Sequence, residues 1–145
     1  MTKAANSGPI VVDASIALAW IMPDEDAPGA QTVLDAVVER GAFAPCLWPL
    51  EDANALYVAS RRNCITAEQR EAALTALADL PVRMEDGTPL LAWTTLSEIA
   101  GDLQLTVYDA AYLDLALRKA MPLATLDEAL KRAAASAGAE LFAFA

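Results

Sequence analysis

Residues 10–15 of the chain read IVVDAS, an apolar run that ends on a carboxylate. Three consecutive β-branched residues without a polar break predict a strand buried on both faces, and the following IALAW at 16–20 predicts the beginning of a helix. Asp13 is therefore expected at the C-terminal end of a strand. Ligands bind at this edge of open parallel α/β sheets, so Asp13 is a candidate for a functional site. The alternative is that Asp13 and Ser15 only cap the helix.

The composition predicts one domain over residues 1–145, because a chain of this length with 56% hydrophobic residues can bury a substantial core. No run reaches the roughly 18 apolar residues that a membrane span needs, and residues 1–9 lack the apolar core of a signal peptide. We therefore expect a soluble, cytoplasmic protein. Cys46 and Cys64 lack CxxC spacing, which favours free thiols.

The sequence contains no histidine. Ser-His-Asp hydrolysis, Cys-His hydrolysis and cleavage of RNA by imidazole are therefore excluded within this chain. Hydrolytic chemistry would have to use carboxylates together with a hard metal ion that prefers oxygen ligands. The net charge of −10 argues against a broad basic surface that coats nucleic acid. It is compatible with an acidic pocket that is filled by metal ions, or with a basic protein partner.

Strand-like and helix-like segments alternate along the rest of the chain. Further strands are expected at 42–45, 81–85, 122–125 and 141–144. Helices are expected at 28–40, 48–62, 66–79, 88–101 and 106–119, and from a capping-box spacing at 125–128 to Gly138. Residues 23–26 (PDED) are expected to form a solvated acidic turn. This alternation is typical of a parallel sheet covered by helices on both faces.

Four acidic residues occupy strand ends or first helical turns: Asp13, Glu51, Asp109 and Asp127. Taken singly, each could be explained by a favourable interaction with a helix dipole and its free N–H groups. Taken together they indicate a site, because helices that follow parallel strands begin at one edge of the sheet. Carboxylates crowded into a small volume repel one another, and protonation or divalent cations relieve that repulsion.

An all-carboxylate set favours Mg²⁺ or Mn²⁺ with bound waters, whereas Zn²⁺ normally takes His or Cys ligands. Such a cluster can hold one or two ions that activate water and stabilise charge on a phosphodiester. Ser15 and Thr125 each lie two residues from an acid and could orient a carboxylate or a metal-bound water, or could cap helices. Asp114 is a further candidate ligand, although its position on the helix is rotated away from that of Asp109.

Aromatic and basic side chains could contact a nucleic acid. The aromatic residues could stack on bases or pack in the core; they are Trp20, Trp48, Tyr108 and Tyr112. The basic residues could hold phosphates or be solvated charges at helix C-termini; they are Arg61, Arg62, Arg118, Lys119, Lys131 and Arg132.

The segments around the acids resemble the PIN-domain ribonucleases, and more closely the VapC-type toxins of bacterial toxin-antitoxin pairs. The matching segments are VVDAS at 11–15, LEDANAL at 50–56, LTVYDAAYL at 105–113 and LATLD at 123–127. They cover nearly the whole chain in order. Asp13, Glu51, Asp109 and Asp127 match the acidic set of that family, and Ser15, Asn54 and Thr125 match its polar companions. The acid at Asp52 and the strongly negative charge are departures.

The resemblance implies an α/β fold, a three-layer α/β/α sandwich with a parallel sheet of about five strands in the order 3-2-1-4-5. It implies that the acidic set holds Mg²⁺ or Mn²⁺ and that the protein cleaves RNA endonucleolytically. It also implies a homodimer and inhibition by a VapB-like antitoxin, whose often basic C-terminal segment enters the active groove. Arg61 and Arg62 are the candidates for contacting RNA.

Three other functions also use acids at strand ends. The first is a catalytically silent PIN-like module whose acidic pocket binds a basic protein partner. The second is a haloacid-dehalogenase-type phosphohydrolase, but that class needs a second Asp two residues after the first, where this chain has Ser15. The third is a phosphoacceptor receiver domain, which needs adjacent acids and a lysine near the sheet edge, and we do not find this pattern.

Overall fold

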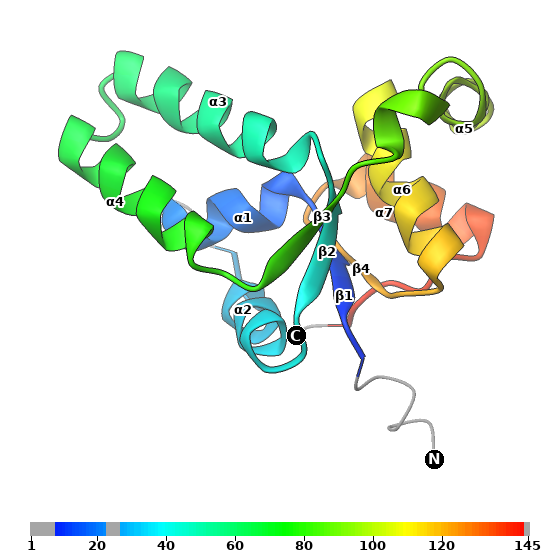
Figure 1. The fold of residues 1–145 in the computed structure, drawn as a ribbon, viewed down its shortest axis with the longest axis horizontal. Coiled ribbons are helices and arrows are strands. Elements are labelled where there is room, and N and C mark those ends of the chain that lie inside the picture. Colours follow the sequence, from blue (N-terminus) through cyan, green and yellow to red (C-terminus); the bar gives the residue numbers. More distant parts are fainter. Residues whose placement is uncertain (1–7, 23–26, 144–145) are drawn as a thin grey trace.

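The computed structural model describes residues 8–22 and 27–143, and the sheet at its centre is parallel (Figure 1). Its strands are β1 (Ile10–Val12), β2 (Ala42–Pro45), β3 (Val82–Glu85) and β4 (Leu123–Ala124), in the order β3-β2-β1-β4. The three residues of β1 are fully buried, as the unbroken β-branched run predicts. The α/β class and the strand order 3-2-1-4 are thereby confirmed.

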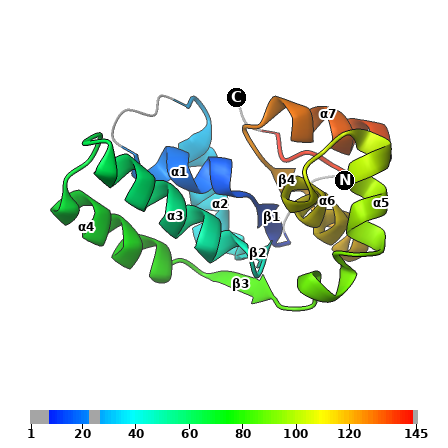
Figure 2. The same cartoon turned by 90° about the horizontal axis from the view of Figure 1, so that it is seen from above.

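Helices cover both faces of this sheet. They are α1 (Ala14–Ile21), α2 (Ala30–Arg40), α3 (Trp48–Arg61), α4 (Ala67–Ala78), a 3₁₀ helix η2 (Thr88–Leu91), α5 (Thr95–Leu103), α6 (Val107–Lys119) and α7 (Glu128–Ala137). The helices α1 to α4 lie on one side of the strands, and α5, α6 and α7 lie on the other (Figures 1 and 2). The result is the expected three-layer sandwich.

The expected fifth strand is reduced to a single bridge. Leu141 pairs in parallel with Leu123, whose N–H donates to the Glu140 carbonyl at 2.9 Å and whose carbonyl accepts from Phe142 N at 2.9 Å. Pairing stops there because β4 is only two residues long, and the chain turns at Thr125 into the helix α7. Within the described residues the sheet therefore has four strands, and Phe144 lies outside them, as does the expected acidic turn at 23–26.

Several helix ends follow the sequence signals, and others do not. The capping box of Thr66 and Gln69 is present at the start of α4. The helix expected at 88–101 is instead divided into η2 and α5, and α5 continues past Gly101 to Leu103. The capping residue of α7 is Asp127, whose Oδ2 accepts from Leu130 N at 2.9 Å, and not Thr125.

The helix α6 is the most deeply buried helix among those described. Residues 110–116 are all buried, because this helix packs against β1, β2 and β4 and against the helices α5 and α7. Its nearly continuous apolar surface predicted this position. Its first turn is consequently held firmly at the carboxyl edge of the sheet. No helix within residues 8–22 and 27–143 is long and apolar enough to cross a membrane.

Candidate functional site: an acidic cluster at the carboxyl edge of the sheet

Asp13 lies where the sequence predicted it, at the carboxyl end of a strand and directly before a helix. It follows β1, caps α1 and is only 4% exposed. Its Oδ1 accepts hydrogen bonds from Ile16 N at 3.1 Å and from the Ser15 hydroxyl at 2.7 Å. The Thr125 hydroxyl donates to its Oδ2. Burial raises the pKa of Asp13 to about 6, although these three donors oppose the rise.

Ser15 and Thr125 connect the end of β1 to the end of β4. The Ser15 Oγ accepts from Leu126 N at 2.8 Å, and the Thr125 Oγ1 accepts from Asp127 N at 3.0 Å. The two hydroxyl oxygens are 3.3 Å apart. Both hydroxyls therefore hold Asp13 while they fix the backbone that leads to Asp127. Neither one caps its helix, which was the alternative for these residues.

Glu51 is positioned by a residue from the opposite face of the sheet. It lies in the first turn of α3, and the hydroxyl of Tyr112 from α6 donates to its Oε1 at 2.5 Å. Burial, followed by the charge of Asp109, raises the pKa of Glu51, whereas the bond from Tyr112 lowers it. Tyr112 itself is 1% exposed, and its pKa is raised by burial and by Glu51. It therefore remains a hydrogen-bond donor.

Asp109 is the electrostatic centre of the cluster. It lies in the first turn of α6, and its N–H donates to the Oγ1 of the capping residue Thr106 at 3.0 Å. Burial and then the charge of Asp127 raise the pKa of Asp109. Asp109 in turn raises the pKa of both Asp13 and Glu51. The structure therefore brings all four predicted acids into one interacting group.

Asp52 was not predicted as part of this group. It is 1% exposed, and within the described part of the chain neither carboxyl oxygen has a hydrogen-bond partner. Burial, followed by the charges of Glu51 and Asp13, raises its pKa to about 8. A signal was present in the sequence, since Trp48 and Leu56 lie four residues before and after Asp52 and define a buried stripe of α3.

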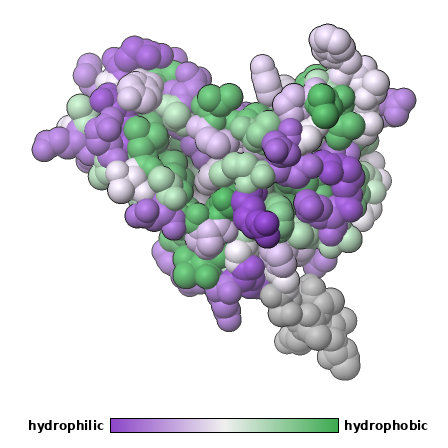
Figure 3. Space-filling model, viewed as in Figure 1, coloured by the Kyte–Doolittle hydropathy of each residue, from purple (hydrophilic) through white to green (hydrophobic). Residues whose placement is uncertain are grey.

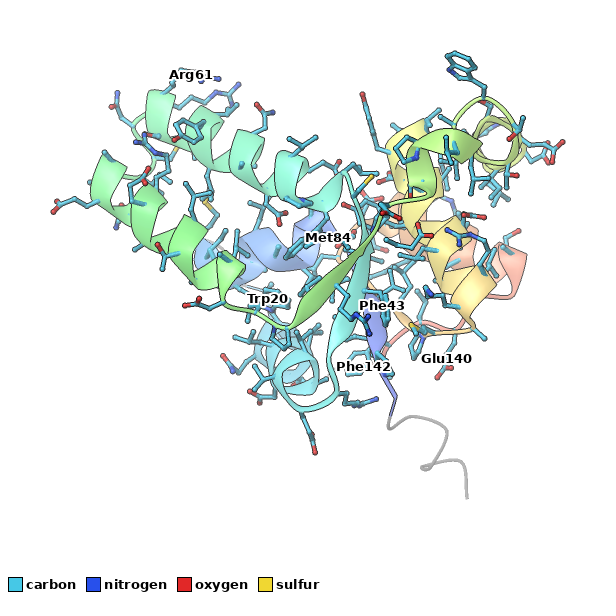
Figure 4. The ribbon with its side chains drawn as sticks, viewed as in Figure 1. Trp20, Phe43, Arg61, Met84, Glu140 and Phe142 are labelled. Atoms are coloured by element: carbon cyan, nitrogen blue, oxygen red, sulfur yellow. The ribbon has the colours of Figure 1, made fainter. Side chains whose placement is uncertain are left out.

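The other candidate residues lie apart from the acids or are already engaged. Asn54 is exposed and lines an open hollow that also borders Glu51. Arg61 lies at the far end of α3 (Figure 4), about 15 Å along the helix from Glu51 at 1.5 Å per residue. Asp114 is bound by Arg118 at 2.7 Å, and Arg118 also contacts Glu85 at 3.5 Å. Asp114 is therefore engaged in an ion pair within α6.

The donor set of the cluster has the chemistry of a hard-cation site, because it consists of carboxylate and hydroxyl oxygens. Burial is the largest cause of the raised pKa values of Asp13, Glu51 and Asp109, and repulsion by a neighbouring acid adds to it. A divalent cation would relieve that repulsion. As the side chains lie, however, no three acidic or cysteine side chains among the described residues form a group ready to hold a metal ion. Both oxygens of Asp13 are occupied by donors of the chain itself.

Comparison with known proteins agrees with this fold. The family model of the PIN domain matches residues 10–136. A search of curated proteins gave no match. Among solved structures, PAE2754 from Pyrobaculum aerophilum is similar with a TM-score of 0.64 and 21% identity, over 88% of this chain and 80% of that one. At this identity the likeness shows the fold. The matched residues include all four acids, from Asp13 to Asp127. The chain belongs to the PIN-domain family, whose fold is generally that of a nuclease.

Proposed function

We propose that the protein is a metal-dependent endoribonuclease that acts as the toxin of a VapBC-type toxin-antitoxin pair. The observation that supports this most strongly is the meeting of Asp13, Glu51, Asp109 and Asp127 around Asp109 at the carboxyl edge of the sheet. Membership of the PIN-domain family makes a nuclease the expected activity of such a cluster. The chain has no histidine, so imidazole acid-base chemistry is excluded and the acids at the sheet edge are the candidate acid-base groups.

Mg²⁺ or Mn²⁺ would be held by these four acids. When bound, the ion would activate a water molecule and stabilise the charge that develops on the backbone phosphate. The chain itself supplies the positioning. Ser15 and Thr125 hold the two oxygens of Asp13, and Tyr112 holds Glu51. These bonds fix the carboxylates before a substrate arrives, which lowers the reorganisation that the reaction requires.

The partners proposed for this site follow from its charge. An acidic cluster in a chain of net charge −10 attracts basic segments, and a VapB-like antitoxin with a basic C-terminal segment would neutralise it. We further propose a homodimer, on the basis of the family resemblance. The RNA would extend along α3 toward Arg61 and Arg62, which are both exposed.

Cleavage of total RNA by the purified chain, freed of any bound partner, tests this proposal. Fragments should form with Mg²⁺ or Mn²⁺, disappear with EDTA, and disappear in the Asp13→Asn variant. Glu39→Gln on the exposed side of α2 is the matched control and should cleave like the wild type. Activity that survives EDTA would contradict the metal requirement.

A second candidate function is a catalytically silent PIN-like module that binds a basic protein partner. It is favoured by the engagement of both Asp13 oxygens with hydrogen-bond donors of the chain itself. A folded, partner-free protein that binds a basic peptide but neither metal nor RNA would support this function over the nuclease.

A further inference from the structure

A hollow of about 380 Å³ borders the acidic cluster on the side of Glu51. It is lined by Leu47, Leu50, Glu51, Asn54 and Tyr108. The first four residues have the spacing i, i+3, i+4 and i+7, so one face of the first two turns of α3 forms one wall. Tyr108, which directly precedes Asp109 in α6, forms the other wall.

The two helices that form these walls, α3 and α6, are in contact beside the acidic cluster. The bond from Tyr112 to Glu51 joins the two helices. Tyr108 lies one turn before Tyr112, on the same face of α6 and closer to the beginning of the helix. Tyr112 is 1% exposed, whereas Tyr108 is 63% exposed. The ring of Tyr108 is therefore available at the mouth, and Tyr112 has no accessible face.

A second hollow of about 160 Å³ adjoins the first. It shares Leu47 and Tyr108 with the first. Its other lining residues are largely apolar and come from η2 and the residue after it, from α5 and α6, and from Cys46, which follows β2. Tyr108 thus stands between two neighbouring hollows. The surface in Figure 3 is notched between the side formed by α3 and α4 and the side formed by α5 and α6, with hydrophobic side chains along the notch.

The chemistry of the lining selects the ligand. No lysine or arginine lines either hollow, and Glu51 borders the larger one. A backbone phosphate would therefore be repelled there, whereas a neutral planar ring would meet an aromatic face and two leucine side chains. Asn54 adds an amide that both donates and accepts, and within the described part of the chain no hydrogen bond to that amide is formed. This combination fits a nucleobase.

We propose that this hollow is a nucleobase subsite, in which an unpaired base of single-stranded RNA stacks on Tyr108 and hydrogen-bonds to Asn54. The base must be unpaired because neither its face nor its edge is free inside an A-form duplex. That the ligand is RNA rests on the proposed nuclease function. The subsite also accounts for how so acidic a chain holds RNA, since stacking needs no cation from the protein.

Fluorescence of 2-aminopurine tests the stacking without requiring cleavage. A short single-stranded oligoribonucleotide that carries this base should be quenched on binding to the wild type in Mg²⁺. Tyr108→Phe should retain the quenching, and Tyr108→Leu should lose it and weaken binding about 5-fold or more, as expected for one stacked base. Trp93→Leu is the control, because Trp93 is 95% exposed and lines neither hollow.

A double-mutant cycle, which combines a protein variant with an abasic RNA substrate, identifies the base that occupies the subsite. An abasic nucleotide placed at each position around the cleavage site should raise KM at one position in the wild type, with kcat nearly unchanged. The same abasic substrate should cause no further loss in Tyr108→Leu, because both changes remove one interaction. Asn54→Ala should alter the preference among bases at that position.

The outcomes separate this proposal from the nuclease proposal. Cleavage that is indifferent to Tyr108→Leu and to every abasic position would overturn the subsite and leave the nuclease intact. Quenching that depends on Tyr108 without any cleavage would support the subsite and contradict the nuclease. Equal quenching by Tyr108→Leu and the wild type would overturn the subsite. A concentration-dependent dimer that Tyr108→Leu dissociates would also overturn it, because a second copy of the chain would then occupy the hollow.

Discussion

The hydroxyl of Tyr112 donates to Oε1 of Glu51 at 2.5 Å and so joins α6 to α3 beside the acidic cluster. The two helices lie on opposite faces of the sheet (Figure 2), so the bond connects the two outer layers of the fold. Tyr112 is buried and Glu51 is partly buried, so the bond is shielded from competing water. It couples the stability of the fold to the position of one candidate metal ligand.

Removal of this hydroxyl should affect stability and the pH profile together. Tyr112→Phe should lower the free energy of unfolding by about 1–3 kcal/mol, as expected for a bond to a charged acceptor. The pKa of Glu51 should rise, because the bond lowers it in the wild type, and the acidic limb of RNA cleavage should move to higher pH. Urea unfolding and a pH–rate profile measure these effects, with Tyr57→Phe as the exposed control. An unchanged pH profile would separate Glu51 from catalysis.

The hydroxyl of Thr125 should matter mainly through Asp13. Thr125→Val preserves the shape of the side chain but removes the donor to Oδ2 of Asp13, so the pKa of Asp13 should rise above its value of about 6. Activity near neutral pH should fall and should recover in part at higher pH. Thr125→Ser keeps the hydroxyl and should behave like the wild type. If Thr125→Ser loses as much activity as Thr125→Val, the methyl group and not the hydroxyl is what matters.

Asp52 should make the protein less stable as the pH rises. Its pKa is about 8 in the fold against an ordinary value of 3.8, so the folded state holds a proton that the unfolded chain releases between these values. The free energy of unfolding should therefore decrease as pH increases from about 4 to 8. The raised pKa values of Asp13, Glu51 and Asp109 act in the same direction.

The Asp52→Asn variant isolates this contribution. Without the ionisable group, the loss of stability between pH 5 and pH 8 should become smaller by about 1–3 kcal/mol. Asp52→Leu should stabilise the protein at pH 8, because it replaces a buried carboxyl that lacks hydrogen bonds with an apolar group. Urea unfolding at the two pH values measures both effects. Identical pH slopes in Asp52→Asn and the wild type would show that Asp52 is solvated in solution.

Arg61 and Arg62 should act on RNA binding and not on the chemical step. Arg61 is the last residue of α3 (Figure 4) and Arg62 is its C-cap, whereas Glu51 lies in the first turn. Reversal of both charges to Glu should therefore raise KM and reduce the salt dependence of binding while kcat changes little. Arg83→Glu, an exposed cation on β3, is the control. Unchanged RNA binding and cleavage would remove both residues from the RNA path.

The sequence predicted those parts of the fold that depend on local patterns. The β-branched run of β1, the capping box of Thr66 and the apolar surface of α6 each dictate one structure. The four acids could also be predicted to meet, because parallel strands place their carboxyl ends at one edge. Ser15 and Thr125 could be expected near these acids because each lies two residues from one of them in the sequence.

The remaining features depend on tertiary contacts that no local pattern encodes. The segment at 141–144 has the composition of a strand, but among the described residues only Leu141 forms a bridge to β4, which is two residues long. The bond between Tyr112 and Glu51 joins residues that are 61 positions apart. Asp52 is buried by the packing of α3, although its neighbour Glu51 is partly accessible. The position of Arg61 relative to the acids depends on the full length of α3.

The central claim is that the four acids act as one divalent-cation site, and a calorimetric titration with Mn²⁺ tests it most directly. Partner-free wild-type protein should bind Mn²⁺ with a defined stoichiometry, and Glu39→Gln should bind it equally well. Asp109→Asn should weaken binding at least about tenfold, because Asp109 interacts with all three of the other acids. Equal Mn²⁺ affinity in Asp109→Asn and the wild type, or no binding by a folded wild-type protein, would contradict the account.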